Sequence, residues 1–80
     1  MITKLYTIRD RKSCMYGSPF GSYNHDTAIR DFQGFCNQVQ NQYIANDLEL
    51  YYIGSFDSDS GCIQGPEKPE FLVQFTSQEE

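Results

Sequence analysis

A stripe of apolar residues at helical spacing stands in the middle of the chain. Steps of three and four residues separate its members, which are Ile29, Phe32, Cys36, Val39 and Tyr43. Residues at this spacing share one face of an α-helix. Asn24 or Asp26 is placed to cap the N-terminus by accepting from free backbone amides. The polar run that follows has no clear stop, so we predict a single amphipathic helix ending near Ala45.

Three other segments are typical of β-strands because they are rich in β-branched and aromatic residues. They are residues 2–9, 48–56 and 71–75. Between the last two, residues 57–61 (Asp-Ser-Asp-Ser-Gly) offer side-chain acceptors and a glycine suited to a turn. We therefore expect Phe56 and Ile63 to pair across a hairpin. The first two strands have apolar residues on both faces, which predicts cover on both faces or a partner chain.

The remaining segments lack regular patterning. Residues 11–24 mix Ser, Gly, Pro and Asn with Tyr16, Phe20 and Tyr23, which predicts an irregular loop anchored by aromatics. The sequence thus predicts one α+β domain over residues 1–75, with a small, mainly antiparallel sheet and one amphipathic helix. The order is strand, helix, strand, strand, and residues 76–80 form a polar C-terminal tail.

Length and charge modify this picture. A chain of 80 residues supports one domain of modest stability, so burial of more apolar surface in a homodimer or higher homo-oligomer would help. Six Phe and six Tyr supply the core that a 39% apolar fraction would otherwise leave small. The formal charge is −5, but residues 1–12 carry four basic side chains against Asp10, a balance of +3, which leaves −8 on the remainder.

Several classes of chemistry find no support in the residues. Cys14, Cys36 and Cys62 are an odd set without C-x-x-C spacing, which argues against a zinc site or a disulfide framework and favours a reducing cytoplasm. Asp57-x-Asp59 starts like a calcium loop, but position twelve of that loop is Lys68. No signal peptide or membrane span is expected.

Catalysis is not expected either. His25 is the one histidine and nothing near it reads as a nucleophile elbow. Walker and GxGxxG loops are absent from the sequence. We therefore expect a protein that is not an enzyme and needs no cofactor.

Nucleic-acid binding has a physical basis in the N-terminal region. A single strand binds to basic grooves that carry exposed aromatic rings, because every base has a face that stacks. The candidate phosphate-binding residues are Lys4, Arg9, Arg11 and Lys12. The candidate stacking residues are Tyr6, Tyr16, Phe20 and Tyr23. Each aromatic has a competing interpretation as a core residue.

Several segments resemble a known viral family. They are residues 4–12, Pro19 with Phe20, residues 26–32, and residues 52–57 with Gly61 and Pro69. The most specific is Ile-Gly-x-Phe-Asp at residues 53–57. Together they resemble the small non-structural DNA-binding protein of gokushoviruses, within the Microviridae, which are tailless single-stranded DNA bacteriophages.

The resemblance implies a viral protein of the infected bacterial cytoplasm. It would bind DNA, most naturally single-stranded viral DNA, during genome replication or the switch to genome packaging, and would not be part of the capsid. The acidic balance over residues 13–80 keeps a second hypothesis open. In it, the protein is an adaptor that contacts the replication initiator or the procapsid without touching DNA.

Overall fold

The computed structural model describes residues 1–76. The strands are β1 (Ile2–Asp10), β2 (Met15–Tyr16), β3 (Phe20–Ser22), β4 (Leu48–Asp57), β5 (Cys62–Gln64) and β6 (Glu70–Gln74). The helices are α1 (His25–Gln38) and α2 (Gln42–Ala45), which stand between β3 and β4 in the chain.

Two long antiparallel strands, β1 and β4, form the centre of the sheet. Their pairing runs from Ile2 opposite Asp57 to Asp10 opposite Leu48. The other edge of β1 pairs with β3 and then with β2, and the other edge of β4 pairs with β6 and β5. All of these pairings are antiparallel, which confirms a mainly antiparallel sheet.

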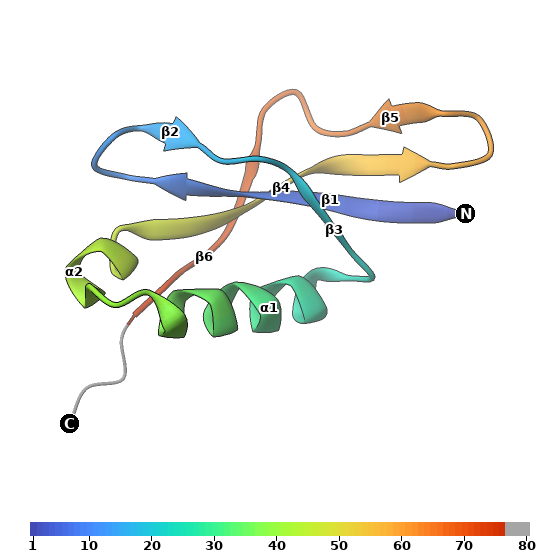
Figure 1. Cartoon of the computed structure of the whole chain (residues 1–80). Coiled ribbons are helices and arrows are strands. Elements are labelled where there is room, and N and C mark those ends of the chain that lie inside the picture. Colours follow the sequence, from blue (N-terminus) through green and yellow to red (C-terminus); the bar gives the residue numbers. More distant parts are fainter. Residues whose placement is uncertain (77–80) are drawn as a thin grey trace.

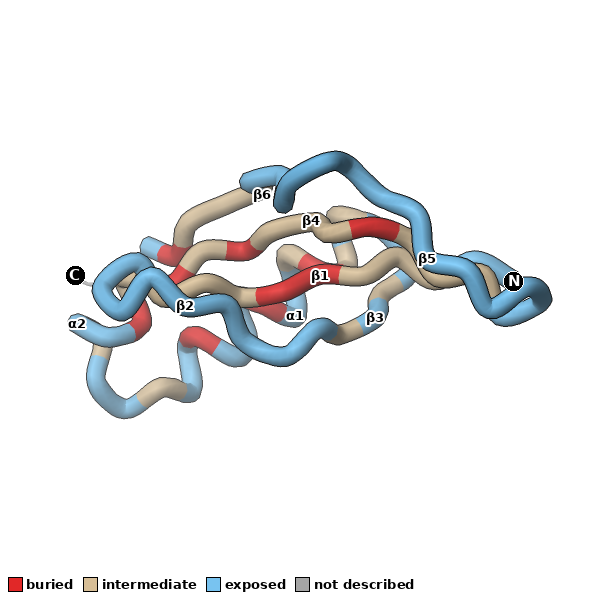
Figure 2. Tube along the Cα trace, turned by 90° about the horizontal axis from the view of Figure 1, so that it is seen from above, coloured by how far each residue is buried: buried red, intermediate tan, exposed pale blue. Residues whose placement is uncertain are grey.

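Both helices lie on one side of this sheet (Figure 1). The core fills the space between them and the strands. Tyr6 and Leu50 from β1 and β4 are fully buried there, together with Phe32 and Cys36 from α1. Seen from above, β1 and β4 run between β2 and the chain that joins β5 to β6, and α1 lies beneath them (Figure 2). The sheet therefore has one helix-covered face and one face that no helix of residues 1–76 covers.

The helical region departs from the single helix that the sequence predicts. The α1 helix begins as expected, because the Asn24 side chain accepts from the amide of Thr27 at 2.8 Å. It ends at Gln38, and Val39 turns to an extended conformation. Asn41 then caps α2 by accepting from the amide of Tyr43 at 2.9 Å. A second cap inside the polar run therefore divides the predicted helix, and only the end at Ala45 is retained.

This break also changes the apolar stripe. Phe32 and Cys36 pack in the core, and Ile29 and Val39 pack against it. Tyr43 lies on α2 and is 86% exposed, so its place in the stripe was wrong. Ala28 and Ala45 are buried in its stead.

The predicted loop at residues 11–24 contains two short strands, which corrects the predicted order of elements. Arg9 pairs with Tyr16 in β2, and Tyr6 pairs with Phe20 in β3. The edge of β1 that faces away from β4 supplies free hydrogen-bonding groups, so short segments without strand patterning pair with it. Over residues 1–76 the observed order is three strands, two helices and three strands.

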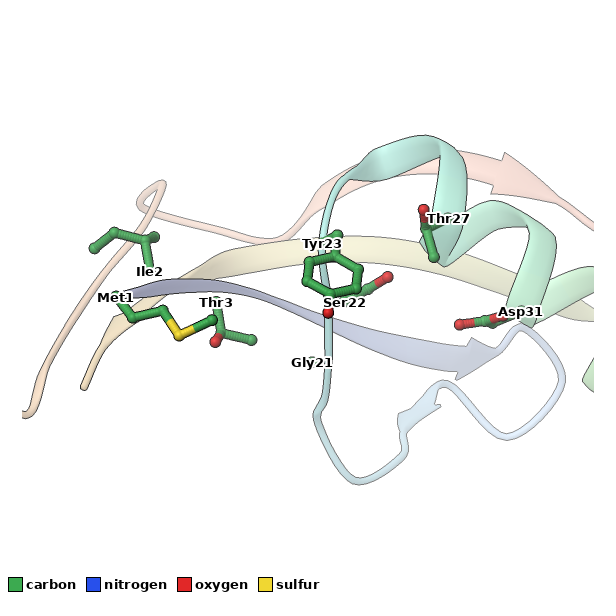
Figure 3. A pocket seen from close by; sticks show the side chains of 8 residues that line it. All are labelled: Met1, Ile2, Thr3, Gly21, Ser22, Tyr23, Thr27 and Asp31. Carbon is green, nitrogen blue, oxygen red and sulfur yellow. The ribbon is translucent and has the colours of Figure 1, made fainter.

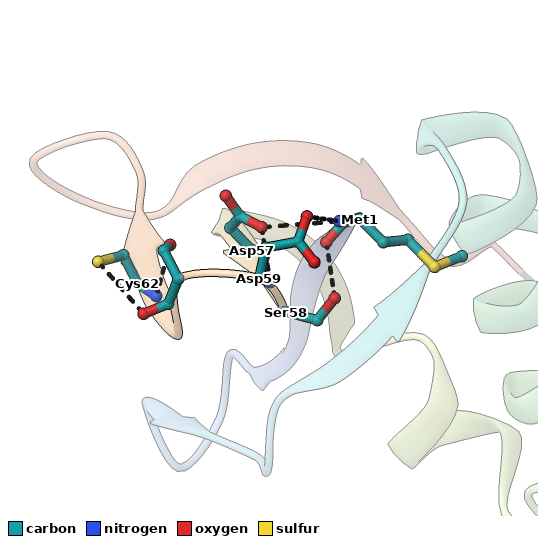
Figure 4. A network of polar contacts seen from close by, with 6 residues as sticks. Met1, Asp57, Ser58, Asp59 and Cys62 are labelled. Atoms are coloured by element: carbon teal, nitrogen blue, oxygen red, sulfur yellow. Dashed lines mark hydrogen bonds and ion pairs between the residues drawn. The ribbon is translucent and has the colours of Figure 1, made fainter.

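The β4–β5 hairpin forms where it was predicted, with Phe56 opposite Ile63. Asp57 accepts from the amide of Asp59 at 2.9 Å, and Gly61 has a φ of 77°. The carboxylates of Asp57 and Asp59 point to the amino group of Met1, at 3.6 and 3.0 Å (Figure 4). These contacts join the tip of the hairpin to the start of β1. Apart from Thr76, the predicted C-terminal tail lies outside the described residues.

Candidate nucleic-acid interface

The uncovered face of the sheet carries a row of aromatic and charged side chains. Residues directly opposite one another in an antiparallel pair share a face, and so do residues two apart in a strand. Arg9 lies opposite Tyr16 on one side and Glu49 on the other. Thr7 lies opposite Tyr51, which lies opposite Phe71. Tyr6 and Leu50 alternate with these residues and enter the core, so the row faces away from the helices.

The three rings of the row are in contact across the sheet. Tyr16 and Tyr51 meet edge to face with 5.5 Å between ring centroids, and Tyr51 and Phe71 do so at 5.7 Å. Tyr16 is 47% exposed and Phe71 is 52% exposed. We call Tyr16, Tyr51 and Phe71 the aromatic row. It offers accessible ring surface on neighbouring strands of a sheet, an arrangement on which unpaired bases can stack.

Charged groups adjoin the aromatic row. The Arg9 guanidinium lies 5.7 Å from the centroid of the Tyr16 ring. One carboxylate, that of Glu49, lies 3.4 Å from Nη1 of Arg9 and 3.8 Å from Nε of Arg11. The Tyr51 hydroxyl donates to the same carboxylate at 3.2 Å. Glu49 thus holds the guanidinium group of Arg9 and the ring of Tyr51 in place.

These contacts influence the protonation of the row. Burial raises the pKa of Tyr51, and the hydrogen bond to Glu49 and its charge raise it further. Desolvation alone would lower the pKa of Arg9, but the charges and the hydrogen bond of its neighbours raise it above its ordinary value. At neutral pH the hydroxyl of Tyr51 therefore stays protonated as a donor, and Arg9 stays charged.

The structure brings some of the predicted site residues together and places others away from them. Arg9, Arg11 and Tyr16 lie together on the uncovered face of the sheet, which we call the open face. Tyr6 was wrongly assigned to stacking: it is fully buried, and its hydroxyl shares a 2.8 Å hydrogen bond with Nδ1 of His25. Phe20 packs against the core with its ring centroid 5.9 Å from that of Tyr6.

The other predicted residues lie elsewhere. Lys12 is exposed in the turn that follows β1, one residue beyond Arg11. Lys4 alternates with Thr3 and Leu5, so it shares the helix-side face of β1 with Tyr6. Tyr23 is exposed and borders an open hollow of about 420 Å³ between the start of β1 and α1 (Figure 3). That hollow also contains Asp31, whose charge repels phosphate.

Sequence reasoning missed Tyr51, Phe71 and Glu49. Tyr51 and Phe71 were assigned to strands, but not to the site. Only the pairing of the strands shows that these residues belong to the site, because Tyr51 and Phe71 lie 35 and 55 positions from Tyr16 in the chain. Once β4 is paired with β1 and β6, the alternation of side chains places all three on one face.

Other features bear on chemistry outside this face. Within residues 1–76, no three His, Cys, Asp or Glu side chains gather in a way that would hold a metal ion. Burial raises the pKa of the Cys36 thiol to about 11, which leaves it an unreactive packing group. No helix in the described part of the chain has the length and apolar character needed to span a membrane.

Comparison with known sequences now places the chain in a family. The model of a family described as Phage ORF5 protein matches residues 3–78. The chain belongs to the Phage ORF5 protein family. That match includes every residue of the aromatic row, with Arg9, Arg11 and Glu49. Searches of curated proteins and of solved structures give no match.

Proposed function

We propose that this Phage ORF5 protein is a DNA-binding, non-structural protein of a gokushovirus, within the Microviridae. It binds single-stranded viral DNA through the open face of the sheet, without catalysis and without a cofactor. It acts in the cytoplasm of the infected bacterium, during genome replication or the switch to packaging. The membership of a phage family supports the setting, and the resemblance described above supports the narrower assignment.

The aromatic row is the observation that carries this proposal. Each ring that stacks on a base contributes about 1 to 3 kcal/mol, whatever the base, so a few exposed rings give useful affinity without sequence preference. Arg9, Arg11 and Lys12 lie beside the row or in the adjoining turn, where phosphates of a stacked strand would pass. Contiguous exposed apolar surface commonly marks an interaction site.

Several of the acidic side chains lie away from this location. Asp26 and Asp31 lie on α1, on the far side of the sheet, and Asp57 and Asp59 lie at the tip of the β4–β5 hairpin beside the amino group of Met1. At physiological salt, charges separated by more than about 8 Å are largely screened from one another. The acidic groups next to the basic end of β1 are Glu49, which contacts Arg9 and Arg11, and Asp10, which accepts from the amide of Lys12.

Fluorescence anisotropy with a labelled single-stranded oligonucleotide tests the proposal. We expect saturable binding by the wild type, and a loss of roughly five- to 150-fold in affinity for Tyr16→Ala or Phe71→Ala. Tyr43→Ala is the matched control, because Tyr43 is also an exposed aromatic but lies on α2 on the other side of the sheet. We expect this control to bind as the wild type does.

Two results would reject the proposal. If a folded wild-type protein shows no binding at 50 mM salt, the acidic-adaptor hypothesis takes its place, with the phage replication initiator or procapsid as the partner. If Tyr43→Ala weakens binding as much as Tyr16→Ala, DNA does not bind at the open face.

A further inference from the structure

An acidic side chain stands in the middle of the proposed DNA-binding face. Glu49 is directly opposite Arg9 in the pairing of β1 with β4, so the strand register fixes its position. Its carboxylate contacts Arg9 at 3.4 Å and Arg11 at 3.8 Å, and it accepts from Tyr51 at 3.2 Å. The side chain of Glu49 is only 12% exposed, so it lies below the surface that a ligand would meet.

This carboxylate reduces the attraction of the face for phosphate. Arg9, Arg11 and Lys12 supply three positive charges, and Glu49 removes one, which leaves two. A phosphate that approached the two guanidiniums would compete with a carboxylate already placed between them. The rings of the aromatic row are unaffected, since Tyr16 and Phe71 stay half exposed.

Attraction to phosphate and stacking on bases, the two contributions to DNA binding, recognise different parts of DNA. Attraction between basic side chains and phosphate is common to single strands, duplexes and other polyanions. Stacking on an aromatic ring needs an unpaired base, because bases in a duplex already stack on one another. A feature that weakens the first contribution and spares the second favours single strands over duplex DNA. Such selection against a competitor is a usual source of specificity.

We infer that Glu49 is a specificity-determining residue that holds Arg9 and Arg11 back from duplex phosphate, so that binding depends on unpaired bases. This inference rests on the proposed function of the open face. It adds to that function the reason why an acidic residue lies among the cations of a DNA site.

The test compares Glu49→Gln with the wild type on one 20-mer, offered single-stranded and as a duplex, between 50 and 200 mM salt. Gln has nearly the shape of Glu and still accepts from Tyr51, so the change removes mainly the charge. We expect duplex affinity at 50 mM salt to rise about three- to tenfold, from the removal of one like charge near phosphate. Single-strand affinity rises less, so the preference for single strands falls.

Two controls separate this effect from a general change in charge. Asp26→Asn removes one negative charge from α1, on the far side of the sheet, and should leave both affinities within twofold of wild type. Glu49→Asp keeps the charge and should retain the preference for single strands. A thermal melt of each variant by circular dichroism checks that it is folded.

The wild type alone provides a second measurement that does not depend on the folding of a variant. Two effective positive charges predict a slope of about −1.4 for the logarithm of affinity against the logarithm of salt on a single strand. Three phosphate contacts, from Arg9, Arg11 and Lys12 without restraint by Glu49, would instead give about −2.1. A measured slope of −2.1 or steeper overturns the inference.

The outcomes also separate this inference from the proposed function. Wild-type binding to single strands with an unchanged duplex affinity in Glu49→Gln overturns the inference and leaves the proposed function standing. Equal gains on both ligands, or an equal effect of Asp26→Asn, overturn it too. Absence of single-strand binding by both wild type and Glu49→Gln rejects the proposed function itself.

Discussion

At the scale of single residues, the position of Gly54 explains why the Ile-Gly-x-Phe-Asp segment contains a glycine. The register between β1 and β4 shifts beside it, since Leu5 lies opposite Gly54 but Tyr6 lies opposite Tyr52. Gly54 takes a φ of 145°, which side chains rarely adopt, and a Cβ there would lie 2.5 Å from the carbonyl oxygen of Gln64. A Cβ on Gly65, the residue after β5, would lie 2.4 Å from the carbonyl oxygen of Ile53, so glycines on both sides permit this close contact.

We therefore expect Gly54→Ala to lower the free energy of unfolding by about 2 kcal/mol or more, from strain and the clash with Gln64. Gly34→Ala is the matched control, because Gly34 lies inside α1 and an added Cβ would meet no atom within 4 Å beyond its chain neighbours and the nearby helix backbone. It should raise the free energy of unfolding by about 0.5 to 1 kcal/mol. Urea denaturation measures both. Equal effects of the two substitutions would show that the register shift beside Gly54 does not require glycine.

Two tyrosines show that the type of a residue does not predict whether it is buried. Tyr6 and Tyr16 were interpreted alike from the sequence, but Tyr6 is buried and Tyr16 is half exposed. The difference depends on which face of β1 the helix covers, and both faces of that strand carry apolar residues. Arg9 and Arg11, both candidate phosphate-binding residues, contact the same carboxylate, because a strand end and its turn keep them close in space.

At the scale of elements, the long patterns were predictable and the short ones were not. The strands β1, β4 and β6 and the start of α1 follow from local composition, spacing and a capping residue. The two short strands at residues 15–16 and 20–22 form because β1 offers them an edge, which no local pattern encodes. The split between α1 and α2 depends on the Asn41 cap, in a run of polar residues where several side chains are able to cap.

The cap at Asn24 has a measurable effect on α1. We expect Asn24→Ala to lower the free energy of unfolding by about 1 kcal/mol, because the amide of Thr27 loses its acceptor. Asn24→Asp keeps an acceptor oxygen and adds a charge that the helix dipole favours, so it should be at least as stable as wild type. Chemical denaturation at neutral pH compares the two. A loss of the same size in Asn24→Asp would mean that the cap does not support the helix.

At the scale of the whole molecule, the sheet separates two surfaces of different composition. The helix-covered face buries the core, and the open face gathers the aromatic row with Arg9, Arg11 and Glu49. The uneven charge along the sequence anticipated the basic region, since residues 1–12 carry +3. It did not anticipate the rings from β4 and β6, which reach that region only through strand pairing.

Photo-crosslinking tests most directly whether DNA lies on the open face. An oligonucleotide that contains 5-iodouracil is bound to the wild-type protein at 50 mM salt and irradiated, and mass spectrometry identifies the crosslinked residues. We predict crosslinks at Tyr16, Tyr51 or Phe71, where bases stack on the aromatic row. Crosslinks confined to Tyr23 or Tyr43, or no crosslinks under conditions that saturate binding, would contradict this location.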